Sequence, residues 1–433
     1  MSPAAGVRAF HLLCAGQSVS VLGSELTGFA LSVWIYQRTD SVTQLSAVLL
    51  ATLLPGIVLA PLAGVCVDRM DRRTVMLLGD TASALCTLAI SLLWLLGRLD
   101  LWSVIGLSAL VSACEAFQSL AWLSLVPQLV PAERLARANG LFQLALAVPR
   151  VIGPAVAGAL LGALGLGSVL LLDFATYLVA VGTLFLVRTP GRPEAAGAEE
   201  ARTSLPREIV QGWSYLRARP GLLGILALLT VTHFSTGVVN VGGQPLVLGF
   251  ASPAVLGALL SVAGVGFVLG SLAMTLWDGP KRLAHGVLGF SLTFGVGLAL
   301  AGLRPSVGLI AAALLVLAGS TPLALGYAQA LWQAEVPQDL QGRVFAVRDA
   351  VTRSALLLGY LITGPLADRV FEPRLASGGA WAGWLGPLVG TGEGRGIALM
   401  LVLAGALPIL AAAAGFLLAT SEGRTPCTTA SFR

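Results

Sequence analysis

The chain has 433 residues, of which 56% are hydrophobic and only 11% are charged, and its mean hydropathy is +0.87. Soluble domains carry about 25% charged residues, so this composition excludes a water-soluble globular protein and indicates a chain that crosses a membrane many times. The net charge of +5 is dispersed over short loops, which excludes a nucleic-acid-binding surface.

The motifs predict no enzyme, cofactor or metal site. The five cysteines, at positions 14, 66, 86, 114 and 427, show no Cys-x-x-Cys spacing, so we expect neither a metal site nor a disulfide framework. There is no Walker loop that would let ATP drive the protein, and no group of His, Asp and Glu has metal-ligand spacing. The Gly-x-Gly strings fall in apolar helices without a preceding strand, which excludes a dinucleotide site.

Apolar runs of about 20 residues are long enough to cross a ~30 Å hydrocarbon core as helices. The chain divides into twelve such runs, so we predict an all-α polytopic membrane protein. Residues 220–277 carry no charge over 58 residues, which is too long for one span, and we divide them near residues 242–245 and 252–253. The predicted spans are 9–36, 44–67, 74–96, 102–126, 139–164, 169–187, 221–243, 254–277, 284–303, 307–333, 346–370 and 396–419.

A polar stretch rich in Pro, Ala, Glu and Arg divides the chain almost at its middle. We therefore predict an N-terminal six-helix bundle at 1–187, a cytoplasmic linker at 188–219, a C-terminal six-helix bundle at 220–420 and a cytoplasmic tail at 421–433. An offset of 206 residues aligns residues 131–137 with 337–343 and also pairs Gly64 with Gly270 and Gly153 with Gly359. This repetition indicates two parallel halves.

Basic residues set the predicted orientation. With the N-terminus inside, 18 Arg and Lys residues lie on the cytoplasmic side and six on the outer side, as the positive-inside rule requires. Of the 26 basic residues 25 are arginine, which indicates a GC-rich bacterial genome. We expect a multi-pass monomer in the lipid bilayer of the bacterial cytoplasmic membrane, with both termini in the cytoplasm.

The segment Gly64–Arg73, with the sequence GVCVDRMDRR, is a short charged turn between two long apolar runs. It resembles the loop between helices two and three of the major facilitator superfamily, although Asp71 stands where that family usually has glycine. The resemblance implies the twelve-helix fold and a gating role, in which Asp68 accepts hydrogen bonds from the start of the eleventh span. The residues concerned are Gly64, Asp68, Arg69, Arg72 and Arg73.

The fifth predicted span resembles the Gly-Pro motif that antiporters of the superfamily carry at this place, through Gly153, Pro154 and Gly158. Glycines let a partner helix approach closely, and the proline leaves a carbonyl free and permits bending. The resemblance implies antiport, whereas tight helix packing alone explains the glycines equally well.

Four of the charged residues within predicted spans stand out, because an uncompensated charge in the hydrocarbon region costs about 2.5–3.5 kcal/mol. They are the candidates for proton coupling: Glu25, Glu115, Arg150 and Asp173. Glu115 and Arg150 lie near the middles of consecutive spans and are expected to form an ion pair, with a structural role as the alternative. Glu25 has no such neighbour, so burial favours its protonated form and makes it the first candidate for the coupling carboxylate; otherwise it is a neutral, hydrogen-bonded residue.

Asp173, one turn inside its span, is either a second proton carrier or a solvated helix end. His233 is either a proton relay or a packing residue. Asp349 and Arg353, four residues apart, are expected to pair along their own helix. Aromatic and polar residues within spans line a substrate cavity or, as helical aromatics commonly do, belong to the core. The cavity candidates are Trp34, Phe117, Phe142, His233, Asn240 and Tyr327.

Three longer stretches are similar to the macrolide-efflux branch of the superfamily, which also resembles enterobactin-type siderophore exporters. They are LGSELTGFALSVWIYQRT, LVPAERLARANGLFQ and VPQDLQGRVFAVRD followed by GYLITGPLADRVFEP. The resemblance implies export of an amphipathic small molecule such as a macrolide-like antibiotic or a siderophore, in exchange for protons. The alternatives are a proton-coupled nutrient importer and a membrane receptor or scaffold that transports nothing.

Overall fold

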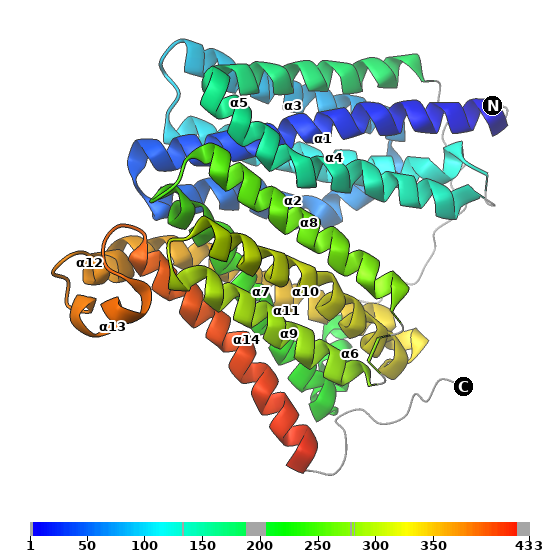
Figure 1. Ribbon diagram of the computed structural model, residues 1–433. Coiled ribbons are helices and arrows are strands. Elements are labelled where there is room, and N and C mark those ends of the chain that lie inside the picture. The colour runs from blue at the N-terminus through cyan, green and yellow to red at the C-terminus, as the bar shows by residue number, and fades with distance from the viewer. Residues whose placement is uncertain (1–2, 132–133, 188–204, 278, 281, 422–433) are drawn as a thin grey trace. The chain divides into compact units, whose positions relative to one another are not determined.

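The computed structural model describes residues 3–131, 134–187, 205–277, 279–280 and 282–421 (Figure 1). Within these ranges the regular structure is entirely helical, because a backbone in lipid must satisfy its own hydrogen bonds and a helix does so within one segment. The predicted all-α fold class is confirmed.

Eleven helices of the described chain are long and apolar enough to cross a membrane. Their ends agree with the predicted spans to within several residues, and most are longer than predicted. They are α1 (Pro3–Thr39), α2 (Val42–Arg69), α3 (Arg72–Leu95), α4 (Leu101–Leu129), α5 (Leu135–Leu186), α7 (Pro220–Leu248), α8 (Pro253–Leu276), α9 (Leu283–Leu303), α10 (Val307–Glu335), α11 (Gln338–Leu366) and α14 (Arg395–Ser421).

Helix α5 accounts for the difference between eleven helices and twelve spans. It contains 52 residues, which at 1.5 Å per residue give about 78 Å, more than twice the thickness of the hydrocarbon core. The helix is interrupted at Gly165, whose φ of 77° and ψ of 176° are not helical. Only glycine adopts this conformation without strain, so α5 consists of two spans that meet at the break predicted between 164 and 169.

Short loops end in side chains that cap the next helix. Ser41, Asp71, Asp100 and Ser306 accept hydrogen bonds from backbone N–H groups in the first turns of α2, α3, α4 and α10, which satisfies donors that have no partner within the helix. Hydrogen bonds from the side chain and the backbone N–H of Ser103 hold the pKa of Asp100 below its usual value. These caps stabilise the starts of the four helices.

The chain forms two compact units. The first comprises Met1–Ala198 together with Ser252–Ser261. In it α1 packs against α5, α2 against α4, and α3 against both α4 and α5. Its main core surrounds Phe10, Leu13, Met76, Trp122 and Leu125, all nearly inaccessible to solvent.

The second unit comprises Glu199–Ala251 and Val262–Arg433. In it α7 packs against α11 and α14, and α9 packs against α10 and α14. The core surrounds Leu216, Leu222, Val287 and Trp332. Helix α6 (Leu205–Arg217) contributes Leu216 to this core, and its Tyr215 hydroxyl donates to the Glu335 carbonyl over 2.9 Å. The predicted linker lies mostly outside the described residues, as does the predicted tail apart from Ser421, and the predicted domain boundaries stay a prediction.

Three short helical segments follow α11 before α14 begins. They are a π-helical turn, η2 (Ala367–Phe371), α12 (Glu372–Leu375) and α13 (Ala382–Val389). The Glu372 carboxylate accepts from the backbone N–H of Gly394 at 3.1 Å and of Ile397 at 2.8 Å. This carboxylate therefore caps the start of α14 and fixes the segment against it.

Candidate functional site

An ion pair joins α1 to the first part of α5. The Arg150 Nε lies 3.5 Å from Glu25 Oε1, and the side chains are 67% and 36% exposed, respectively. The pairing of Arg150 with Glu115 that we predicted is therefore wrong. The rotation of each helix about its axis decides which side chains meet, and the position of a residue along its helix does not fix that rotation.

Close helix packing holds Glu25 beside α5. A Cβ atom placed on Gly153 would lie 3.0 Å from the Glu25 Cβ, which is tighter than most real Cβ contacts. Two residues before Glu25 on α1, a Cβ on Gly23 would lie 2.5 Å from the Asp173 Oδ1. Both glycines therefore allow the backbones of α1 and α5 to approach at the level of the charged residues.

Asp173 is buried, with 2% of its surface exposed. The Thr87 hydroxyl donates to Oδ2 over 3.4 Å, and the Thr176 hydroxyl lies 3.5 Å from Oδ1 and donates to the Asp173 carbonyl over 2.7 Å. The interpretation of Asp173 as a solvated helix end is therefore wrong. The helix resumes directly after Gly165, so Asp173 lies about two turns inside it instead of one.

Asp80 is a buried acidic residue that was not among the predicted site residues. Gln17 Nε2 donates to Asp80 Oδ2 over 2.8 Å, and Gln118 Nε2 donates to Gln17 Oε1 over 2.6 Å. The chain of hydrogen bonds thus links α3 to α1 and α4. A signal for it was present in the sequence, because Asp80 is the only charged residue between Arg73 and Arg98.

Glu115 completes a cluster of charges within the first unit. It lies in the middle of α4 and its side chain is exposed. Glu25, Asp80, Arg150 and Asp173 all lie close enough to act on it electrostatically. We call these five residues the carboxylate cluster: it contains four carboxyl groups and one guanidinium group.

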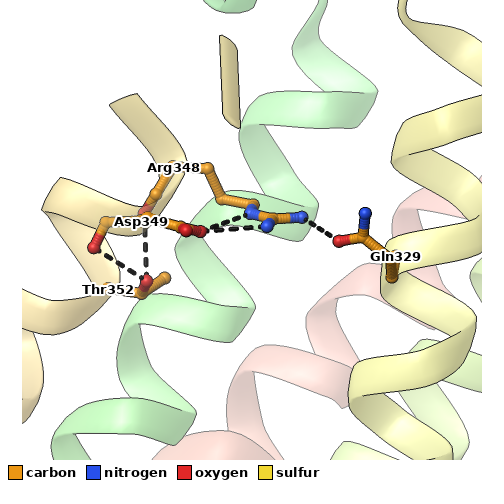
Figure 2. Close-up of polar contacts among 4 residues, drawn as sticks. All are labelled: Gln329, Arg348, Asp349 and Thr352. Atoms are coloured by element: carbon orange, nitrogen blue, oxygen red, sulfur yellow. Dashed lines mark hydrogen bonds and ion pairs between the residues drawn. The ribbon is translucent and has the colours of Figure 1, made fainter. Parts of the chain in front are cut away.

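A polar pocket lies between α7, α10 and α11 of the second unit, with a volume of about 370 Å³. Figure 2 shows four of the residues that line it, Gln329 on α10 facing Arg348, Asp349 and Thr352 on α11. His233 on α7 also lines it, as does the apolar Leu229. His233 therefore lies at a pocket, and its role in a substrate cavity stays a prediction.

The ion pair in this pocket is formed by adjacent residues. Arg348 Nη2 lies 2.9 Å from Asp349 Oδ1, and Arg348 Nη1 donates to Gln329 Oε1 over 2.7 Å. The predicted pair between Asp349 and Arg353 is not formed. The long Arg348 side chain bends toward α10, where Gln329 holds it, and this brings its guanidinium within reach of Asp349.

Comparison with known proteins identifies the family. The family model described as Major Facilitator Superfamily matches residues 13–360, which is most of the chain. The chain belongs to the major facilitator superfamily.

Similar members of the superfamily include efflux proteins. The chain is 25% identical over 373 residues to macrolide efflux protein A of Streptococcus pyogenes, covering 83% of this chain and 90% of that protein. It is 26% identical to the multidrug efflux pump Tap of Mycolicibacterium fortuitum, covering 80% of this chain and 86% of Tap. The resemblance to the macrolide-efflux branch is confirmed.

Solved structures show the same fold. A bacterial homolog of the human lysosomal transporter Spinster, in an inward-facing and unoccupied conformation, superimposes with a TM-score of 0.70 at 17% identity, over 100% of both chains. The superfamily and this fold are those of a multi-pass membrane transporter that takes small molecules, not of an enzyme.

In the superfamily loop, Arg73 has a structural contact. Its Nε donates to the Leu184 carbonyl over 2.9 Å and its Nη2 to the Phe185 carbonyl over 3.3 Å, at the C-terminal end of α5, where a positive charge is favourable. Arg69 is exposed, Arg72 is half-buried, and Gly64 has open space where a Cβ would lie. The side chain of Asp68 lies outside what the structure describes, so its gating contact stays a prediction.

The Asp71 that departs from the superfamily pattern has a clear local role. Its Oδ2 accepts from the Thr74 backbone N–H over 3.0 Å and from the Thr74 hydroxyl over 2.9 Å. It thereby caps α3, and its backbone φ of −66° does not require glycine.

The Gly-Pro motif lies within α5 before the break at Gly165. Gly153 and Gly158 are buried and Pro154 is half-buried. The helix continues through Pro154, so the motif produces no helix break of its own. The motif permits two close contacts: Gly153 with Glu25 on α1, and Gly158 with the start of α8, where a Cβ would lie 2.6 Å from the Pro253 carbonyl oxygen.

Several aromatic cavity candidates belong to the cores instead. Phe142 packs in the core of the first unit with its ring 5.8 Å from that of Trp122, and Phe117 packs against the same core. Tyr327 lies in the core of the second unit, stacked on Phe290 at 5.8 Å. Apolar neighbours hold these side chains, and their role as cavity residues stays a prediction.

The two remaining cavity candidates have polar contacts. The Arg38 guanidinium lies over the Trp34 ring, 5.1 Å from its centre. The Asn240 amide donates to the Tyr360 hydroxyl over 2.9 Å, which joins α7 to α11, and Asn240 is exposed. Of the six candidates, His233 is the one that lines the polar pocket.

Proposed function

We propose that this member of the superfamily is a secondary active transporter that exports amphipathic small molecules, macrolide-like antibiotics among them, in exchange for protons. The names of its relatives, a macrolide efflux protein and a multidrug efflux pump, support export of this substrate class. Siderophore export rests only on the sequence resemblance and is the less supported part of the substrate class.

The observation that carries the proton-coupling proposal is the carboxylate cluster. Its one guanidinium group pairs with Glu25 and acts on Glu115, whereas Asp80 and Asp173 have hydrogen bonds from neutral side chains. If all were ionised, the cluster would hold three uncompensated negative charges, each costing about 2.5–3.5 kcal/mol in the hydrocarbon region. We therefore propose that some of these carboxyl groups hold protons, as a proton-coupled carrier requires.

Within the cluster, Glu25 is the proposed proton carrier. Its contact with Arg150 is a single ion pair at 3.5 Å between partly exposed groups, so it is easily broken and re-formed. Protonation of Glu25 would release Arg150, which also acts electrostatically on Glu115. In the proposed cycle Glu25 loses its proton toward the cytoplasm as substrate enters and regains one from outside.

The proposal includes the arrangement of the carrier in the membrane. We place the chain in the bacterial cytoplasmic membrane as a monomer with both termini in the cytoplasm, because the basic residues of its loops are concentrated on that side. Rocking of two six-helix bundles, 1–187 and 220–420, would expose the substrate to each side in turn.

The test uses inside-out vesicles that contain the full chain and hold an imposed proton gradient. Macrolides should discharge the gradient with the wild-type chain, and Glu25→Gln should abolish the discharge because the amide cannot carry a proton. The matched control is Asp40→Asn, an exposed acid just after α1 whose positive φ of 45° asparagine tolerates. Failure of every ligand to discharge the gradient, with folded protein, would favour the importer or the scaffold.

A further inference from the structure

The polar pocket of the second unit has no part in the proton cycle proposed above. All of its lining residues belong to that unit: Leu229, His233, Leu325, Gly326, Ala328, Gln329, Arg348, Asp349 and Thr352. A polar pocket within apolar helices is unfavourable unless its groups find partners. The unused hydrogen-bonding capacity of these residues therefore shows what the pocket can receive.

The positive charge of the pocket is already engaged. Arg348 donates through Nε and Nη2 to Asp349 Oδ1, at 3.0 and 2.9 Å, and through Nη1 to Gln329 Oε1. Its guanidinium also lies 4.9 Å from the centre of the Phe345 ring, which adds a cation–π contact. Only 15% of the side chain is exposed, so Arg348 offers little to an incoming anion.

The negative partner is far more accessible. The Asp349 side chain is 49% exposed, and Arg348 engages only its Oδ1. Among the described residues no group donates a hydrogen bond to Asp349 Oδ2. A carboxylate accepts hydrogen bonds and donates none, so the accessible side of the ion pair is an acceptor that carries negative charge.

His233 supplies a second acceptor. Its Nδ1 lies 2.8 Å from the carbonyl oxygen of Leu229, four residues earlier and about one helical turn away on α7. A carbonyl can only accept, so Nδ1 carries the hydrogen and Nε2 of the neutral ring is left as an acceptor. No described residue donates to Nε2, and the ring lines the same pocket as Asp349.

Together these features assign a ligand chemistry. We propose that the pocket receives the protonated amine of an amphipathic substrate, with Asp349 as its counter-charge, His233 Nε2 as a second acceptor and Leu229 and Leu325 against its alkyl groups. The inference rests on the proposed export function, because it names the substrates of that function as cationic amphiphiles. A volume of about 370 Å³ admits the amine head group and the atoms next to it.

The test measures occupancy of the pocket directly and needs no transport. Leu325 lines the pocket and is 41% exposed, so Leu325→Cys places a thiol there without disturbing the core. The full chain in lipid nanodiscs is treated with N-ethylmaleimide, and alkylation of Cys at 325 is followed by mass spectrometry of its peptide. The probes are benzyldimethylamine, which is protonated at neutral pH, and isobutylbenzene, its uncharged isostere.

Benzyldimethylamine should slow the alkylation at concentrations where isobutylbenzene does not. Adding Asp349→Asn should raise the half-protective concentration about tenfold, the size expected for losing one charge-assisted hydrogen bond, while the asparagine oxygen can still accept from Arg348. Glu335→Gln, an acidic residue at the end of α10 outside the pocket, is the matched control and should change nothing.

Three results would overturn the proposal: equal protection by both probes, no protection by the amine, or undiminished protection in Asp349→Asn. Saturation-transfer NMR of benzyldimethylamine with the chain that retains Leu325, and with its Asp349→Asn variant, repeats the comparison if Leu325→Cys fails to fold. Protection by the amine in a chain whose vesicles show no discharge would retain the pocket and reject the proposed transport. Discharge by the vesicles without protection by the amine would reject the pocket and retain the proposed transport.

Discussion

The two units place their charged residues differently although both are built from packed spans of one kind. The first holds four carboxyl groups against one guanidinium, whereas the pocket of the second holds one carboxylate bonded to one guanidinium. The repeat offset of 206 residues places Val231, Thr321 and Leu356 opposite Glu25, Glu115 and Arg150. These three charged residues of the cluster therefore have no charged counterparts in the second half of the chain. This difference favours proton binding in the first unit and ligand binding in the second.

The largest expected effect comes from removing the single positive charge of the carboxylate cluster. Arg150→Gln should lower the maximal rate of substrate-induced proton discharge at least tenfold, because the deprotonated Glu25 loses its counter-charge. Both partners are partly exposed, so the change in folding stability should stay within about 1 kcal/mol. Vesicle discharge and thermal unfolding in detergent measure the two quantities separately.

Arg369→Gln, in η2 after α11 and away from both sites, is the control for loss of one arginine. If Arg150→Gln instead loses folding stability to an extent that accounts for its lower discharge rate, the ion pair has a structural role. That outcome would remove the distinction drawn between the units, because the cluster would then only hold α1 against α5.

A smaller and different effect is expected from the second unit. Asp349→Asn should raise the half-saturating concentration of a cationic substrate about tenfold and leave the maximal rate of discharge nearly unchanged. The reason is that the variant removes a ligand contact and leaves the carboxylate cluster intact. A lowered maximal rate with an unchanged half-saturating concentration would show that Asp349 belongs to the coupling machinery, and the division between the units would fail.

The glycines of α5 test whether close packing matters at the cluster. Gly153→Ala would place a methyl group 3.0 Å from the Glu25 Cβ, which should cost about 1 kcal/mol of stability and slow transport by displacing Glu25. Gly162→Ala is the matched control, since nothing lies within 4 Å of its Cβ position, and it should be neutral or slightly stabilising. The packing argument is refuted if Gly153→Ala and Gly162→Ala have the same melting temperature.

The smallest expected effect concerns the loop after α2. Asp71 caps α3, whereas the residue at the repeat offset is Trp277, and Arg282, the N-cap residue of α9, makes no side-chain cap hydrogen bond. Asp71→Ala should cost about 1 kcal/mol and Asp71→Gly only a few tenths, with discharge unaffected in both. Chemical denaturation of the two variants measures this difference in folding stability. Loss of discharge in Asp71→Gly would instead give Asp71 a role in gating.

The membrane-spanning helices of this chain can be predicted from its sequence because their positions depend on the lengths of the apolar runs. The break in α5 shows this clearly: 52 residues cannot form one span, and the glycine-rich region around Gly165 is where the sequence permits the interruption. The caps at Ser41 and Asp71 also depend on nearby residues, because each side chain accepts a hydrogen bond from the backbone N–H three residues later. In such cases the deciding interactions lie within a few residues of one another.

The partners of the charged side chains are different, because they depend on how distant helices are rotated and packed. Arg150 lies at nearly the depth of Glu115 but meets Glu25. Asp349 pairs with its neighbour Arg348 because Gln329, on another helix, bends the arginine toward the pocket. Asp173 is buried by threonines from α3 and its own helix, which its position along the span does not reveal.

The most direct test of proton coupling through Glu25 is erythromycin exchange in proteoliposomes of the Glu25→Gln chain. Exchange of labelled for unlabelled erythromycin without a gradient needs substrate binding and alternation only, whereas accumulation against a concentration difference needs the proton. We expect exchange at close to the wild-type rate and no accumulation under an imposed proton gradient. Gradient-driven accumulation that persists in Glu25→Gln would contradict the account.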